Sequence, residues 1–136
     1  MNKRILLIDD ETDVLAADIR NLKEDFDVFN ADNGSDAMNT IKSNYEFTVF
    51  ISVLKMPGIN GVAILSILKN IFPDSVRVLI TRHPDTEIAF DTDNEGQIFR
   101  FLTKPYPMTR LIRALKECIE EYYLKSKNLK AWKKRI

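Results

Sequence analysis

Short apolar runs alternate with stretches of helical periodicity along the chain, and this alternation constrains the fold more than any other feature. Each run is too short for a helix and lacks the polar alternation of a half-exposed strand. It therefore predicts a strand buried on both faces. Five strands are predicted, of which the second is the weakest, over residues 4–8, 27–31, 47–53, 76–81 and 98–103.

Helices are predicted between the strands. The first is expected to begin at a cap on Asp13 and to place Val14, Ala17, Leu22 and Phe26 on one face. The second helix is expected to begin at a cap on Ser35 and to end at residue 41, and the third is expected over 61–71. The fourth is expected over about 85–95, ended by Gly96, and the last is expected to begin at Met108. Strands that alternate with helices in this way form a parallel sheet covered on both faces. The fold class is therefore α/β, a three-layer doubly wound flavodoxin-like (βα)5 domain with strand order 2-1-3-4-5.

Polar side chains gather where the predicted strands end. In open α/β sheets, ligands bind at the carboxyl ends of the strands. That edge should carry Asp9 and Asp10, Val53 with Lys55, Thr81, and Lys104. After the third strand, Pro57 and Gly58 predict a turn, because proline lacks an N–H and glycine accepts positive φ.

Four segments, in this order and at these separations, resemble the chemotaxis-regulator-like receiver domain of bacterial two-component response regulators. They are ILLIDDE at the first strand, KMPGING after the third, LIT at the end of the fourth and FLTKP after the fifth. The resemblance covers roughly residues 3–122. It implies a signalling domain in a phosphorelay, without enzymatic activity of its own, in which a histidine kinase donates a phosphoryl group to an aspartate ending the third strand.

The resemblance also implies roles for the neighbouring residues. Asp10 would bind Mg²⁺ directly, Asp9 would bind it directly or through water, and the backbone carbonyl of Lys55 would be a further ligand. Lys104 would neutralise one phosphoryl oxygen and Thr81 would donate a hydrogen bond to another. Phe101 matches an aromatic switch position that responds to the threonine, and Pro105 is expected to be cis.

The expected phosphoacceptor position holds Val53, which has no lone pair to offer a phosphoryl group. Ser52 cannot replace it, because neighbouring side chains in a strand point to opposite faces. The substitution is either natural, giving a receiver that signals without phosphorylation, or an engineered knockout of an ordinary receiver. With one carboxylate fewer, Mg²⁺ is expected to bind weakly or not at all, and Lys104 could pair with Asp9 or Asp10. Val53→Asp should restore Mg²⁺ binding and phosphorylation if the rest of the pocket is intact.

Several single residues have an ordinary interpretation beside the functional one. Phe101 is as well explained by a core position as by a switch. Arg82 could reach over the pocket and attract an anion, although a solvated surface arginine is the simpler interpretation. His83 is expected to be a solvated loop residue, and Cys118 to be buried without chemistry.

Residues 123–136 are expected to form a basic helical extension beyond a receiver domain at 1–122. Six basic residues and no acidic residue follow position 124. Three interpretations stay open: a helical linker toward an output domain outside this chain, a basic arm that touches nucleic acid, or a solvated end. A homodimer could form through this helix or through the surface of the fourth helix, fifth strand and last helix. That same surface is where a kinase or another signalling protein would dock.

Bulk properties agree with a single cytoplasmic domain. Lys and Arg together equal Asp and Glu at 20 each, so the charge of the whole chain gives no hint of a partner, and one cysteine excludes an internal disulfide. No apolar run approaches the length of a membrane span. The rival interpretation, a small flavodoxin-like enzyme or nucleotide-binding domain, lacks a glycine-rich phosphate loop after the first strand. A DNA-binding protein acting through its basic tail is a third option.

Overall fold

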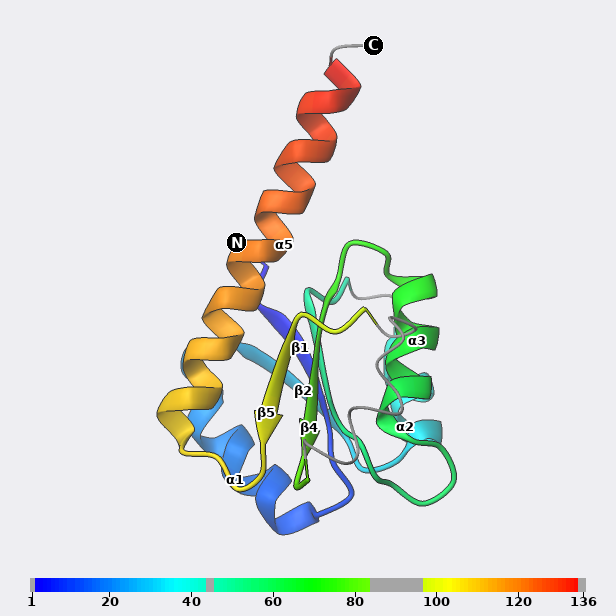
Figure 1. Cartoon of the computed structure of the whole chain (residues 1–136), viewed down its shortest axis with the longest axis vertical. Helices are drawn as coiled ribbons and strands as arrows, with labels where there is room; N and C mark the ends of the chain where they lie inside the picture. Colours follow the sequence, from blue (N-terminus) through cyan, green and yellow to red (C-terminus); the bar gives the residue numbers. More distant parts are fainter. Residues whose placement is uncertain (1, 44–45, 84–96, 135–136) are drawn as a thin grey trace.

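The computed structural model describes residues 2–43, 46–83 and 97–134. All strand pairings are parallel, and the strands lie in the order β2-β1-β3-β4-β5, as predicted. In Figure 1, α1 and α5 cover one face of the sheet and α2 and α3 cover the other. The described elements are β1 (Arg4–Ile8), α1 (Thr12–Leu22), β2 (Asp27–Ala31), α2 (Gly34–Ile41), β3 (Val49–Val53), α3 (Gly61–Ile71), β4 (Val76–Thr81), β5 (Arg100–Thr103) and α5 (Met108–Lys134).

The three central strands are buried on both faces, which explains their largely apolar sequences, although Arg77 of β4 and Ser52 of β3 are also buried. Alternate residues of β1 enter different clusters: Ile5 and Leu7 pack toward α1 and α5, whereas Leu6 and Ile8 pack toward α2 and α3. Burying one such side chain contributes about 1.5–3 kcal/mol. The two clusters hold the sheet between its helical layers and so fix the edge at which the strands end.

Several predicted boundaries were wrong by a few residues. The third strand begins at Val49, not at 47, and the fifth begins at Arg100, not at 98. The first helix ends at Leu22, so Phe26 lies beyond it, although Phe26 still packs in the core. Pairing sets these limits, because the fifth strand aligns with β4 only from Arg100 opposite Val78.

Both predicted caps were also wrong. Helix α1 follows Glu11, whose side chain makes no capping bond, so Asp13 lies in the first turn instead. Helix α2 is capped by Asn33, which accepts a hydrogen bond from the backbone N–H of Asp36 at 2.8 Å, so Ser35 lies inside the helix. Asparagine is at least as good an N-cap as serine. The helix predicted at 85–95 and its terminator Gly96 lie outside the described residues.

Helix α5 runs without interruption from Met108 to Lys134, across the boundary expected at residue 122. Its inner face is buried up to Tyr122, and its last turns project past the sheet (Figure 1). Cys118 on this face is fully buried, and burial raises the pKa of its thiol to about 12. Within the described ranges, none of the helices combines the length and the apolarity that crossing a membrane requires.

Candidate functional site

Main-chain hydrogen bonds continue just past the strands and place the candidate residues. The N–H of Asp9 donates to the carbonyl of Ala31 at 3.1 Å, and the N–H of Lys104 donates to the carbonyl of Thr81 at 2.9 Å. The ladder between β3 and β4 pairs Val53 with Ile80. The ends of β1, β3, β4 and β5 therefore meet at one edge, where the sequence placed the site.

The loop after β3 packs against the backbone of residue 53. Gly58 has φ of 91°, in the region that favours glycine. The N–H of Gly61 donates to the carbonyl of Leu54 at 2.7 Å, and a Cβ on Gly61 would lie 2.2 Å from the carbonyl oxygen of Val53. Only glycine therefore allows α3 to begin this close to the strand.

A cleft of about 180 Å³ opens at this edge of the sheet. Val53 is 5% exposed and forms part of its wall. The Ser52 hydroxyl donates to the carbonyl of Val53 at 2.9 Å and does not line the cleft. Five predicted site residues line the cleft, namely Asp10, Val53, Lys55, Thr81 and Lys104, whereas Asp9, Phe101 and Pro105 do not. The other lining residues are Glu11, Leu54, Ile80, Arg82 and His83.

Lys104 forms a buried ion pair with Asp9, one of the two pairings that the sequence had left open. The Lys104 Nζ lies 2.9 and 3.1 Å from the two Asp9 carboxylate oxygens. Asp9 is 0% exposed and the Lys104 side chain 6%. Asp9 Oδ1 also accepts the backbone N–H of Glu11 at 2.9 Å. The Asp9 carboxylate therefore has an ion-pair partner and a backbone hydrogen bond, which together offset the cost of burying its charge.

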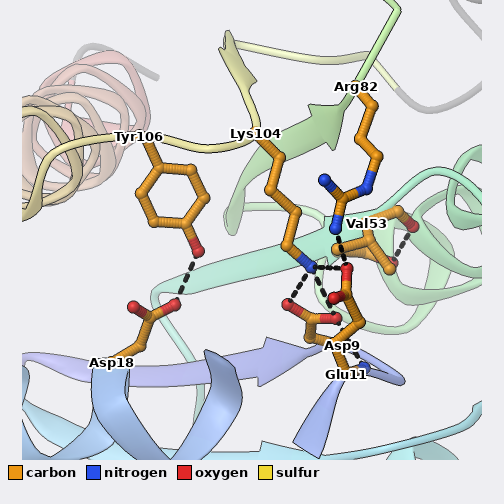
Figure 2. A network of polar contacts seen from close by, with 8 residues as sticks. Asp9, Glu11, Asp18, Val53, Arg82, Lys104 and Tyr106 are labelled. Carbon is orange, nitrogen blue, oxygen red and sulfur yellow. Dashed lines mark hydrogen bonds and ion pairs between the residues drawn. The ribbon is translucent and has the colours of Figure 1, made fainter. Parts of the chain in front are cut away.

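Glu11 was not singled out from the sequence, yet it joins two cations. Its Oε1 lies 2.7 Å from Lys104 Nζ and also pairs with the Arg82 guanidinium (Figure 2). Hydrogen bonds from Lys104 and then Arg82 lower the pKa of the Glu11 carboxyl. The Arg82 side chain is 52% exposed, as expected of a surface arginine, and it also pairs with an acid of this chain at the cleft.

A second buried acid lies beside this network. The Tyr106 hydroxyl donates to Asp18 Oδ2 at 2.6 Å (Figure 2), and Asp18 is 4% exposed on α1. Burial raises the pKa of Asp18, partly offset by that hydrogen bond, and burial together with Asp18 raises the pKa of Tyr106. The sequence carries a signal for this pair, since Asp18 interrupts the buried stripe of Leu15 and Leu22 on α1.

The remaining predicted residues have clear positions. Thr81 is 3% exposed, and its hydroxyl oxygen accepts the backbone N–H of His83 at 3.2 Å. Phe101 is 39% exposed on β5, so the interpretation of Phe101 as a core residue was wrong, whereas its role as a switch stays a prediction. The Lys104–Pro105 peptide bond is cis.

The residues at the cleft do not fit a divalent cation as they stand. Mg²⁺ demands a near-octahedral set of oxygen ligands. Both oxygens of Asp9 lie against the Lys104 ammonium, Val53 supplies no side-chain oxygen, and Asp10 is exposed at the rim. Within residues 2–43, 46–83 and 97–134, no group of three or more acidic, histidine or cysteine side chains is placed to hold a metal ion.

Comparison with known proteins identifies the family of the chain. Residues 5–116 match the response regulator receiver domain. Over 120 residues the chain is 31% identical to the hydrogenase transcriptional regulatory protein HoxA of Bradyrhizobium diazoefficiens, covering 88% of this chain and 24% of that protein. It is 28% identical to sporulation initiation phosphotransferase F of Bacillus subtilis, covering 86% of this chain and 94% of that protein.

The match to one solved structure covers more of the chain than the family match over residues 5–116. A chain described as adenylate cyclase from Rhodopirellula baltica is 36% identical, with a TM-score of 0.89, and the match covers 98% of this chain and 99% of that one. The chain therefore spans about a quarter of the length of HoxA and nearly all of the other two.

Proposed function

Because the chain belongs to the response regulator receiver domain family, we propose that it is a two-component signalling module that receives no phosphoryl group at position 53. It acts instead as a phosphorylation-independent protein-interaction domain. The observation that supports this proposal is the apolar side chain of Val53 in the wall of the cleft, beside Asp10, Thr81 and Lys104.

The chemistry of acyl phosphate formation explains why this position decides the function. The reaction needs a carboxylate oxygen that attacks phosphorus, and a valine side chain carries no nucleophile. The neighbouring Ser52 does not substitute, since its hydroxyl is fully buried outside the cleft and donates to a main-chain carbonyl. Thr81 and Lys104 line the cleft and are the phosphoryl-binding groups that the family resemblance implies, but no group at position 53 would carry the phosphoryl.

Receiver domains work with histidine kinases and output domains, and we propose partners of these kinds for this cytoplasmic module. The expected contact surface includes β5, with exposed Phe101, and α5. A homodimer through this surface or through the end of α5 belongs to the same proposal. An enzymatic role is not proposed for this cleft, because its volume of about 180 Å³ is below the roughly 300–1,000 Å³ typical of small-molecule sites.

A mass measurement tests the proposal. The native protein is incubated with acetyl phosphate and MgCl₂, and its intact mass is determined beside an ordinary receiver domain treated in the same way. The ordinary receiver should gain one phosphoryl group, while this chain should keep its mass. A covalent phosphoryl adduct on the native chain, on any residue, would contradict the proposal.

A further inference from the structure

Three loops that carry the cleft are tied together by one ion-pair network (Figure 2). Glu11 follows β1, Arg82 follows β4 and Lys104 follows β5, so each residue comes from a different strand end. Lys104 lies between the carboxylates of Asp9 and Glu11, and Glu11 Oε1 lies between Lys104 and Arg82. The order of contacts is therefore Asp9, Lys104, Glu11, Arg82, with acid and base alternating.

This network is electrically balanced without any ion from solution. It holds two carboxylates and two cations, and each cation contacts at least one carboxylate. A divalent cation that entered the cleft would have to compete with the Lys104 and Arg82 side chains for these two carboxylates. To bind the oxygens of Asp9, the divalent cation would have to displace the Lys104 ammonium. The displaced ammonium could turn to Glu11, but Glu11 already pairs with Arg82.

We propose that Lys104 and Arg82, linked through Glu11, take the place of a metal ion in this cleft, so that restoring a carboxylate at position 53 alone does not recover full Mg²⁺ affinity. The inference rests on the proposed function, because it assumes the receiver pocket. It adds Arg82 as the residue that closes the network over the cleft. The Arg82 and Glu11 side chains are 52% and 44% exposed, which makes their pair the weakest link and the one to test.

The test measures Mg²⁺ binding by isothermal titration calorimetry on variants of the full chain. Val53→Asp is compared with Val53→Asp/Arg82→Ala. The matched control is Val53→Asp/Arg113→Ala, which removes the same charge from an exposed position on α5. Loss of the partly exposed pair should tighten Mg²⁺ binding about fivefold. The Arg113 control should bind Mg²⁺ as Val53→Asp does. Equal affinities for the Arg82 and Arg113 double variants would overturn the inference.

A second measurement covers the case in which a charge at position 53 prevents folding. In the native background, the melting temperatures of Glu11→Gln, Arg82→Ala and the double variant are compared. If the two side chains share one contact, the double variant should lose less than the sum of the single losses. Strict additivity would show that the contact is absent and would also overturn the inference.

Different measurements refute the proposed function and the proposed ion-pair network. A phosphoryl adduct on the native chain would refute the proposed function whatever the calorimetry shows. A tight Mg²⁺ site in Val53→Asp, unaffected by Arg82, would refute the network while leaving the native chain unable to accept phosphate at position 53.

Discussion

Removing the ammonium group of Lys104 should be among the most destabilising single changes in the site. Lys104→Met keeps much of the side-chain volume and deletes the charge. Asp9 is 0% exposed, and among the residues that the structure describes, the Glu11 N–H is the one hydrogen-bond donor left to its carboxylate without Lys104. Breaking a buried pair by removing one partner costs about 3–5 kcal/mol. Because one backbone donor remains, we expect a loss of about 3 kcal/mol.

Urea unfolding followed by far-ultraviolet circular dichroism measures this loss. Asp9→Asn combined with Lys104→Met removes both charges, so the double variant should recover most of the stability and fall short of the native chain by about 1 kcal/mol. Lys116→Met, on an exposed position of α5, controls for the substitution itself and should change the free energy of unfolding by at most about 0.5 kcal/mol. A loss below about 1 kcal/mol for Lys104→Met, or a double variant no more stable than the single one, would refute the reasoning.

Three further outcomes are expected in the same unfolding assay. Tyr106→Phe deletes the hydroxyl that bonds buried Asp18 and should cost about 1–3 kcal/mol. Burial raises the folded-state pKa of the Asp18 carboxyl, so its contribution to the free energy of unfolding is fully present below the ordinary carboxyl pKa and is lost as pH rises through the folded-state pKa. Asp18→Asn should flatten this part of the profile of stability against pH. An unchanged profile would contradict the assignment. Gly61→Ala forces a Cβ against the carbonyl of Val53 and should cost about 3 kcal/mol of stability. Gly58→Ala has open space around the new Cβ but a positive φ, and it should cost about 1 kcal/mol. If Gly58→Ala were the more destabilising of the two, the packing argument would be contradicted.

The central strands were predictable because runs of mostly apolar residues mark them in the sequence. Residues 4–8 and 76–81 are buried on both faces, so no polar alternation obscures them. The ends of elements were less predictable, because a cap depends on which residue first leaves helical geometry. Asn33 and Ser35 are both suitable caps by type, and only the course of the chain after β2 decides between them.

The site was predictable where its residues follow strands and less so where they pair across the fold. The sequence placed Thr81 and Lys104 at one edge, because parallel strands end together. It did not single out Glu11, whose two partners lie 71 and 93 positions away and whose role depends on side-chain reach. The bond between Asp18 and Tyr106 was also missed, although an acid within an apolar helical stripe is a usable sign of a buried partner.

The unbroken α5 helix gives this domain a stiff arm. Residues 123–134 extend it past Tyr122 by about 18 Å at the usual helical rise, with Tyr123 still packed against the core. A tilt of roughly ten degrees where the helix lies on the sheet would swing its tip by about 3 Å. A small change in the tilt of the helix would thus be enlarged at its far end.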